Sequence, residues 1–210
     1  MKTIKDRSLY LVISEEYCAG RSPFEVAEKA IAGGVDIVQM REKKKSMQEL
    51  VGIGRSIAAL CREKGVMFIV NDYPMLAQRV GADGVHLGQE DMSRFPITMA
   101  RDILGPGKKI GVSTTSLEQL RKANDSDADY IGFGPVFQTK LKLNPVGTEY
   151  IKDIIKIAQK PVFFIGGIDM SNIGEILDRG GRNIALIRAI TEAEDIESSA
   201  RTLKERLLET

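Results

Sequence analysis

The sequence predicts a single-domain TIM barrel, an α/β fold in which eight parallel strands alternate with helices. Short apolar runs rich in Val, Ile and Phe recur along the 210 residues, and each is followed by a segment with helical spacing. Most of these runs are continuously hydrophobic, which is typical of strands that are buried on both faces of a parallel sheet. Eight such repeats in a chain of this length fit a compact (β/α)8 barrel.

The predicted strands follow one another at regular intervals along the chain. They cover residues 9–13, 35–40, 67–70, 84–87, 109–112, 130–133, 162–165 and 184–187. A doubly wound sheet is the alternative fold, but no GxGxxG turn follows an early strand to support it. We therefore expect one domain over residues 1–210, with an active site at the C-terminal ends of the strands.

The helices between these strands carry their own boundary signals. Ser22 predicts the start of one helix, residues 46–61 form an amphipathic helix, and Ser116 opens another. Gly65 and Gly180 predict two helix ends, because glycine readily adopts the left-handed conformation that stops a helix. The alternation of strand and helix therefore continues through the whole chain.

Composition excludes several classes of partner. Thirty basic residues nearly cancel 29 acidic ones, so no overall positive field would hold a nucleic acid or an anionic membrane surface. Residues 9–13 are the longest apolar stretch near the start, far below the roughly 20 residues of a membrane helix. Cys18 and Cys61 belong to no metal-binding pattern. We expect a cytoplasmic protein that can form a homodimer through an apolar outer helix face.

Cationic side chains are concentrated where the active face of a barrel is expected. Arg41 and Lys43 follow the second predicted strand, and Lys140 and Lys142 lie in the irregular segment 134–147. This segment is too long for an ordinary connection, so we expect it to act as a mobile active-site loop. Arginine offers a planar fork and lysine a mobile point charge, so together these residues could surround a polyphosphate.

Carboxylates and glycines at neighbouring strand ends indicate two further binding features. Asp72 and Asp91 follow adjacent predicted strands, so both could contact one hard cation that also binds phosphate oxygens, which suits Mg²⁺. Gly166 and Gly167 precede a helix that we expect to begin near Ser171, and they offer N–H groups to a monophosphate. In the simpler alternatives, each aspartate caps the next helix and the glycine pair is only a tight turn.

The only histidine, His86, lies at the apolar end of the fourth predicted strand. We interpret it as a hydrogen-bonded structural histidine at the barrel mouth rather than as a general base. The polar residues of the predicted active face include no clear nucleophile and no acid/base pair. The site is therefore suited to electrostatic stabilisation and alignment of substrates.

Six motifs occur in a fixed order along the chain. They are QMREK at 39–43, VND at 70–72, GADGVHLGQED at 81–91, GVS at 111–113, residues 132–137 with Thr139, and IGGI at 165–168. Each motif is weak by itself, but the ordered set closely resembles the thiamine phosphate synthase family over nearly the full length. The resemblance implies a transferase that joins an aminopyrimidine diphosphate to a thiazole phosphate, or its carboxylated form, with release of pyrophosphate and with Mg²⁺ as cofactor.

The resemblance also implies roles for residues on the pyrimidine side of the site. Gln39 would orient the aminopyrimidine, while Arg41, Lys43, Asn71 and Lys142 would hold its diphosphate. Arg41 and Lys142 are expected to take part in catalysis, because cations stabilise the departing pyrophosphate.

A second group of residues is implied for the metal, the reacting centre and the thiazole phosphate. The two aspartates would engage Mg²⁺ directly or through water. Ser113, expected to be catalytic, and Thr139 would line the reacting centre. Backbone at Gly167, together with the end of the eighth strand, would receive the thiazole phosphate. Arg188 at that strand end could bind a phosphate through its side chain or point away from the site.

Three positions depart from the usual family pattern. Thr115 replaces a histidine, Leu141 replaces a loop threonine, and Arg188 replaces a small hydroxyl residue. One alternative function is a thiazole tautomerase on the same barrel, but such relatives typically use the histidine that Thr115 replaces and can dispense with the metal carboxylates. The other alternative is a non-catalytic barrel that binds a thiamine precursor or product.

Overall fold

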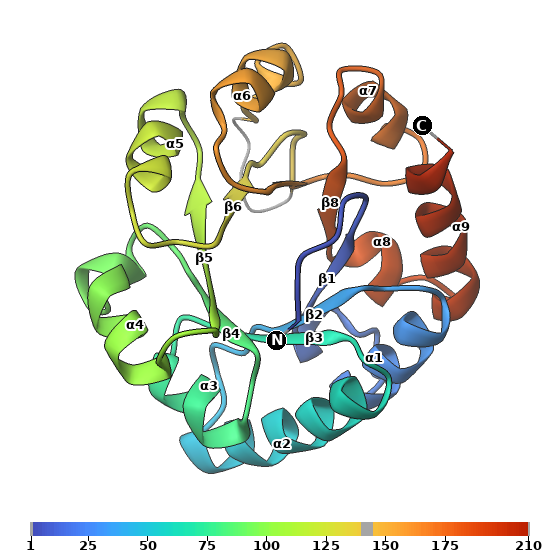
Figure 1. Ribbon diagram of the computed structural model, residues 1–210. Coiled ribbons are helices and arrows are strands. Elements are labelled where there is room, and N and C mark those ends of the chain that lie inside the picture. The colour runs from blue at the N-terminus through green and yellow to red at the C-terminus, as the bar shows by residue number, and fades with distance from the viewer. Residues whose placement is uncertain (1, 140–144, 210) are drawn as a thin grey trace.

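The computed structural model describes residues 2–139 and 145–209, and within them eight parallel strands form one closed barrel. Each strand pairs with the next along the chain, and the last pairs with the first, so no edge is left open (Figure 1). The predicted barrel is confirmed and the doubly wound alternative is wrong. The strands are β1 (Leu9–Ile13), β2 (Ile37–Met40), β3 (Met67–Asn71), β4 (Gly84–Leu87), β5 (Lys109–Thr114), β6 (Tyr130–Phe133), β7 (Val162–Ile165) and β8 (Asn183–Leu186).

Four of the eight predicted strands have different bounds in the structure: β5 extends two residues further, to Thr114, and β8 begins one residue earlier, at Asn183. The second strand begins at Ile37 rather than at residue 35, because the Asp36 carboxylate turns to accept the Leu9 N–H. The last strand ends one residue early, because Ile187 is already the N-cap of the short helix that follows. β3 continues to Asn71, so this polar side chain is carried by the strand itself.

Helices surround the barrel as an outer ring, and α9 packs beside α1 to complete it (Figure 1). The side chains of Ser22, Ser46 and Ser116 cap their helices as predicted. No helix in the described residues is long and apolar enough to cross a membrane. The helices are α1 (Pro23–Ala32), α2 (Met47–Glu63), α3 (Pro74–Val80), α4 (Ile97–Leu104), α5 (Leu117–Asn124), α6 (Ile151–Ile157), α7 (Ile173–Leu177), α8 (Arg188–Thr191) and α9 (Ile196–Leu208), with short 3-10 helices η1 (Glu15–Tyr17) and η2 (Asp91–Ser93).

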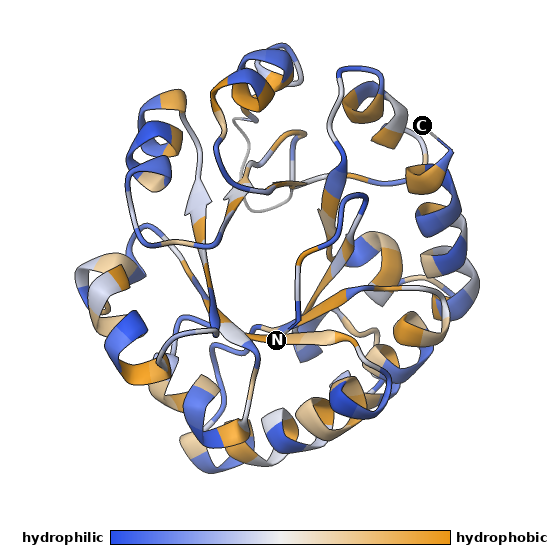
Figure 2. Ribbon diagram, in the orientation of Figure 1, coloured by the Kyte–Doolittle hydropathy of each residue, from blue (hydrophilic) through white to orange (hydrophobic). Residues whose placement is uncertain are grey.

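The continuous hydrophobicity of the strands reflects two separate cores. Alternate residues of a strand point to opposite faces, so in β1 Leu9 and Leu11 pack toward the helices while Tyr10 and Val12 fill the barrel interior. Figure 2 shows hydrophobic residues on the strands and hydrophilic residues recurring along the outer helices. Because both faces of each strand are buried, the sheet is held from inside and outside.

Aspartates at the opposite, N-terminal end of the barrel join neighbouring strands. Asp36 accepts the Leu9 N–H and the Lys204 ammonium group, and Asp83 accepts the Phe68 N–H. Each aspartate lies just before an even-numbered strand and bonds to the preceding odd-numbered one. Such contacts at the bottom of a barrel serve stability rather than catalysis.

Asp129 is the most highly connected of these carboxylates. It accepts the Ile110 N–H at 2.9 Å, and it pairs with Arg101 at 2.7 Å and Lys109 at 3.1 Å. Burial opposes ionisation, but these hydrogen bonds hold the pKa of Asp129 below its usual value. A carboxylate with a lowered pKa stabilises the fold above its unfolded-state pKa, and this stability is lost as the pH falls through the folded value.

We expect Asp129→Ala to lower the free energy of unfolding by about 3 kcal/mol, because it leaves partly buried donors without their acceptor. Urea denaturation at neutral pH measures the change. The control is Asp153→Ala, which removes an exposed carboxylate from α6. Equal effects of the two substitutions would show that the Asp129 contacts contribute nothing specific.

Candidate functional site

Two carboxylates meet at the C-terminal ends of β3 and β4. Asp72 directly follows β3 with a left-handed φ of 65°, and its N–H donates to the His86 carbonyl at 2.8 Å. Asp91 begins η2, and its side chain interacts with that of Asp72. A Cβ added at Gly88 would lie 2.6 Å from Asp91 Oδ2 and 3.9 Å from Asp72 Oδ1. Gly88 therefore leaves the space in which the carboxylates approach each other.

The electrostatics of this pair fit a divalent cation. Burial and the neighbouring Asp91 carboxylate raise the pKa of Asp72 to about 6, while Lys43 opposes the rise. Across residues 2–139 and 145–209, no cluster of three His, Cys, Asp or Glu side chains could hold a metal ion. Mg²⁺ is often bound by one or two carboxylates, with water and substrate phosphates as its other ligands. The donor set matches that pattern.

The simpler interpretation of these aspartates as helix caps is wrong. Tyr73 is the N-cap of α3, and Pro96 is the N-cap of α4, in each case without a side-chain cap. Asp72 instead sits in a conformation that costs a residue with a Cβ roughly 1–2 kcal/mol. Strain of this kind is concentrated at functional sites.

Cationic residues lie beside the carboxylates. Arg41 follows β2 and is half-buried, with its N–H donated to the Ile13 carbonyl, whereas Lys43 is exposed. Asn71 ends β3 in register with His86. The predicted loop cations Lys140 and Lys142 lie outside the described residues. In the described part of the chain, Lys43 is thus the predicted cation whose charge acts directly on Asp72.

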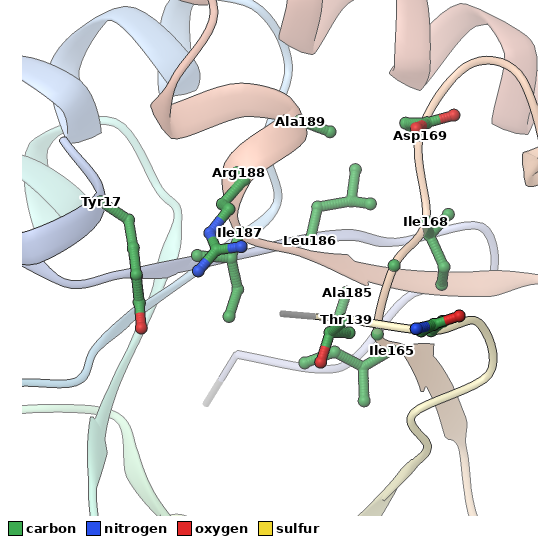
Figure 3. Close-up of a pocket in the computed structure, with 13 residues that line it drawn as sticks. Tyr17, Thr139, Ile165, Ile168, Asp169, Ala185, Leu186, Ile187, Arg188 and Ala189 are labelled. Carbon is green, nitrogen blue, oxygen red and sulfur yellow. The ribbon is translucent and has the colours of Figure 1, made fainter. Parts of the chain in front are cut away.

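A cavity of about 470 Å³ opens at the ends of β7 and β8. Gly166 has a φ of 103° and Gly167 a φ of 67°, so both adopt backbone conformations that favour glycine. A Cβ on Gly167 would lie 2.6 Å from the Gln138 carbonyl, so a side chain there would push back the segment leading to Thr139. The cavity is lined by Tyr17, Gln138, Thr139, Ile165, Gly166, Gly167, Ile168, Asp169, Ala185, Leu186, Ile187, Arg188 and Ala189 (Figure 3).

The predicted active-site loop is tied to β7 at its base. The Val136 N–H donates to the Ile165 carbonyl and the Phe137 N–H to the Gly166 carbonyl, both at 2.9 Å. The two ends of the loop are also joined, because the Gly147 N–H donates to the Val136 carbonyl. These bonds fix the base of the segment that leads to Thr139, which lines the cavity.

The helix after the glycine pair begins later than expected. We predicted a start near Ser171, but α7 begins at Ile173, with Asn172 as its N-cap. The Asn172 amide donates to the Gly167 carbonyl at 2.8 Å, which fixes the turn. The short helix α8 follows β8 directly, and its first N–H groups have no partner within the helix. Barrels often bind a phosphate between these two elements.

Arg188 reaches across one wall of the cavity toward the loop after β1. The Arg188 guanidinium faces the Tyr17 ring (Figure 3), and its carbon lies 4.5 Å from the ring centre. Its Nε lies 3.4 Å from Glu192 Oε1. Arg21 holds this loop in place by donating to the carbonyl of Thr191, the last residue of α8, and to the carbonyl of Ala193 just beyond it. No sequence pattern points to Tyr17, because its position depends on contacts between distant loops.

Polar side chains are also linked by hydrogen bonds inside the barrel, below the mouth. The amide nitrogen of Gln39 donates to the Tyr10 hydroxyl, which lies 3.0 Å from the Tyr130 hydroxyl. His86 Nδ1 lies 3.3 Å from the Tyr130 hydroxyl, and His86 Nε2 lies 2.9 Å from Ser113 Oγ. His86 is thus hydrogen-bonded, as predicted, and burial lowers its pKa to about 4. Sequence reasoning missed both tyrosines.

The side chain of Thr115 lies beside Gln119 of α5 and takes no part in this group. The Thr115 N–H donates to Gln119 Oε1 at 2.7 Å, and its side chain is exposed at the start of α5. Gln89 instead reaches β5 from the neighbouring loop and donates to the Ser113 carbonyl. Ser113 is therefore fixed by hydrogen bonds to both its backbone carbonyl and its side-chain hydroxyl.

Comparisons with known proteins agree on one family. The family model described as thiamine monophosphate synthase matches residues 9–190. A thiamine-phosphate synthase of Halalkalibacterium halodurans is 41% identical over 93% of both chains, and one of Persephonella marina is 40% identical over 95% of both. The solved structure of a thiamine phosphate pyrophosphorylase from Pyrococcus furiosus has a TM-score of 0.85 at 36% identity, covering 96% of this chain and 97% of its own.

Proposed function

Because this chain belongs to the thiamine monophosphate synthase family, we propose that its barrel mouth joins an aminopyrimidine diphosphate to a thiazole phosphate, with Mg²⁺ at Asp72 and Asp91. The chain is an enzyme, a transferase of the thiamine-phosphate synthase type. The tautomerase and non-catalytic alternatives receive no support from these relatives, which carry the synthase name.

One observation carries the assignment of the two substrates. The mouth has two different halves, an ionic half at β2 to β4 and the glycine-lined cavity at β7 and β8, with Ser113 on β5 between them. The ionic half suits a diphosphate with its metal ion, and the cavity suits a monoester phosphate. Two substrates bound in this way would react near the Ser113 hydroxyl.

The proposed reaction needs alignment and charge stabilisation more than proton transfer. The bond between the pyrimidine methylene carbon and the diphosphate oxygen breaks, and its electron pair leaves with pyrophosphate. The lone pair of the thiazole nitrogen then forms the new carbon–nitrogen bond. Arg41, Lys43, Asn71 and Lys142 would stabilise the departing anion. A bound Mg²⁺ would supply further positive charge to the leaving group.

Thiamine phosphate formation from the two purified substrates tests the function. We expect product with Mg²⁺ and a loss of product when a chelator removes the metal, with recovery on adding Mg²⁺ back. Product formation that is indifferent to chelation would contradict the metal assignment. Tight binding of thiazole phosphate without any product would contradict the proposed reaction.

We expect Lys142→Ala to raise the KM for the pyrimidine diphosphate about tenfold or more and to leave the KM for thiazole phosphate nearly unchanged. The prediction rests on the sequence motif, since the residue lies outside the described part of the chain. Lys122→Ala on α5 is the control, because this exposed lysine pairs with Glu118 one helical turn away and lies outside the predicted site. Equal losses for both substrates would contradict a role at the leaving group.

We expect Arg188→Ser to weaken binding of thiazole phosphate about tenfold or more, because a charge-assisted hydrogen bond contributes roughly 1.5–3 kcal/mol. The substitution restores the hydroxyl residue usual in the family. Isothermal titration with thiazole phosphate measures the effect, and the unphosphorylated thiazole alcohol is the control ligand. An unchanged affinity would mean that the guanidinium serves only to pack on Tyr17.

A homodimer remains a prediction. Large hydrophobic side chains are exposed on the outer ring, including Met75 on α3 at 56% and Met99 on α4 at 42%. A second copy could cover such residues. Sedimentation velocity would distinguish a dimer from a monomer.

A further inference from the structure

Five polar side chains form a continuous hydrogen-bond chain across the barrel interior. In order they are Gln39, Tyr10, Tyr130, His86 and Ser113, and they come from strands β2, β1, β6, β4 and β5. We call this group the interior chain. Its two ends are the residues expected at the pyrimidine and at the reacting centre, whereas its three middle members have no assigned role in substrate binding or catalysis.

The number of available protons fixes the direction in which hydrogen bonds are donated along the interior chain. The Gln39 amide nitrogen donates to the Tyr10 oxygen, and the other recorded partner of this hydroxyl is Tyr130, so the Tyr10 O–H donates to Tyr130. Tyr130 in turn must donate its own proton to His86 Nδ1. A neutral imidazole carries a single N–H, so the proton of His86 lies on Nε2 and is donated to Ser113 Oγ.

Donation in the opposite direction, from Ser113 toward Tyr10, is unfavourable while the Gln39 amide nitrogen points at Tyr10. It would leave the Tyr10 O–H without an acceptor in a side chain that is only 2% exposed, at a cost of about 1–3 kcal/mol. The opposite direction becomes satisfied only if the Gln39 amide turns over and offers its oxygen to Tyr10. The orientation of Gln39 and the tautomer of His86 are therefore coupled.

The barrel interior gives the middle of the chain little freedom to move. The ring of Phe163 packs edge-on against Tyr10 at 5.1 Å and Tyr130 at 5.6 Å between ring centres. Glycine on β5 and β6 provides the necessary space, since a Cβ at Gly111 would meet the Tyr130 ring and one at Gly132 would lie 3.2 Å from the His86 ring. The hydroxyl groups are thus held at fixed positions.

We infer that Tyr10, Tyr130 and His86 are positioning residues that make Gln39 a hydrogen-bond acceptor and Ser113 a donor toward the pyrimidine substrate. The Gln39 amide nitrogen is engaged below, so its carbonyl oxygen is left for the amino group of the pyrimidine. A pyrimidine with an oxo group in place of this amino group would set its oxygen against the Gln39 carbonyl oxygen. Because both atoms are acceptors, the site would bind that pyrimidine more weakly. The Ser113 O–H is left to donate to the departing diphosphate oxygen.

This specificity rests on the proposed function, but the order of the interior chain does not. The protein has a single histidine. The imidazole region of a long-range ¹H–¹⁵N spectrum of the labelled protein therefore shows the signals of His86 alone. At neutral pH, without substrate, we expect one proton-bearing nitrogen at Nε2 and one bare nitrogen at Nδ1. A proton on Nδ1, or an imidazolium, would overturn the inference.

Tyr130→Phe breaks the interior chain while keeping the ring. We expect the His86 tautomer preference to weaken and the discrimination between amino and oxo pyrimidine diphosphates to fall about tenfold, the equivalent of one hydrogen bond. The KM for thiazole phosphate should stay within about twofold, as expected of a change confined to the pyrimidine. Unchanged discrimination with a folded protein would overturn the inference.

A double-mutant cycle separates positioning from general packing. Tyr10→Phe and Tyr130→Phe should each cause nearly the full loss of discrimination, and the double variant should add little, because the chain acts as a unit. Phe163→Leu is the matched control, since it disturbs the same interior layer without removing a hydrogen bond, and it should lower stability but not discrimination. Additive losses, or an equal loss in Phe163→Leu, would overturn the inference. An Nε2–H imidazole in a protein that makes no thiamine phosphate would contradict the proposed function alone.

Discussion

Asp91→Asn is expected to reduce turnover about a thousandfold, because a metal ion contributes several kcal/mol of charge stabilisation to the departing pyrophosphate. The fold should persist, and without metal the variant should be at least as stable as the parent, because one of two facing carboxylate charges is gone. Thermal denaturation with and without Mg²⁺ measures this directly. Mg²⁺ should raise the melting temperature of the parent and not that of the variant.

Companion substitutions distinguish loss of the metal from general damage. Asp102→Asn makes the same chemical change on the exposed face of α4 and should leave both activity and the Mg²⁺ response intact. Gly88→Ala keeps both charges but places a Cβ 2.6 Å from Asp91 Oδ2, so it should also weaken the Mg²⁺ response. At the neighbouring carboxylate, Asp72→Asn is preferable to Asp72→Ala, because asparagine tolerates the left-handed backbone better. Parent-like turnover in Asp91→Asn would exclude the metal site.

The Mg²⁺ response should also weaken in acid. Since burial and the Asp91 carboxylate raise the pKa of Asp72 to about 6, protons compete with the metal for this carboxylate below that pH. The melting-temperature increase caused by Mg²⁺ should therefore be full above about pH 7 and shrink as the pH falls toward 5. An increase of constant size over this range would place the metal elsewhere.

Gly111→Ala is expected to lower the free energy of unfolding by about 3 kcal/mol or more, which for a chain of this size is a fall in melting temperature of roughly 10 °C. The added Cβ would lie 2.5 Å from the Tyr130 hydroxyl oxygen and closer still to the ring. Tyr130 is 1% exposed and surrounded by Tyr10 and Phe163, so it has no space into which to move. Differential scanning calorimetry measures the loss.

Gly52→Ala is the control with the opposite expected sign. Gly52 lies on the exposed face of α2, and an added Cβ would meet nothing within 4 Å. Alanine favours a helix interior over glycine by roughly 0.5–1 kcal/mol, so this variant should be slightly more stable than the parent. If both alanines changed stability equally, the tight packing of Gly111 against Tyr130 would not be the cause.

The alternation of strands and helices could be predicted from sequence because it depends on local patterns. Continuous apolar runs such as residues 130–133 mark strands that are buried on both faces, and serine caps such as Ser46 mark helix starts. The placement of Asp72 and Asp91 after adjacent strands followed from the order of the repeats alone. Their facing carboxylates agree with that prediction.

Features that depend on contacts between distant strands and loops could not be predicted in this way. Tyr10 and Tyr130 are separated by 120 residues and look like ordinary core residues in sequence, and only the closure of the barrel brings their hydroxyl groups together. The stacking of Arg188 on Tyr17 depends in the same way on the loop that Arg21 fixes. Local patterning thus determined the fold and the list of polar residues at the mouth. The tertiary structure decided which side chains face one another, because the distances between side chains of different strands are set only when the sheet closes.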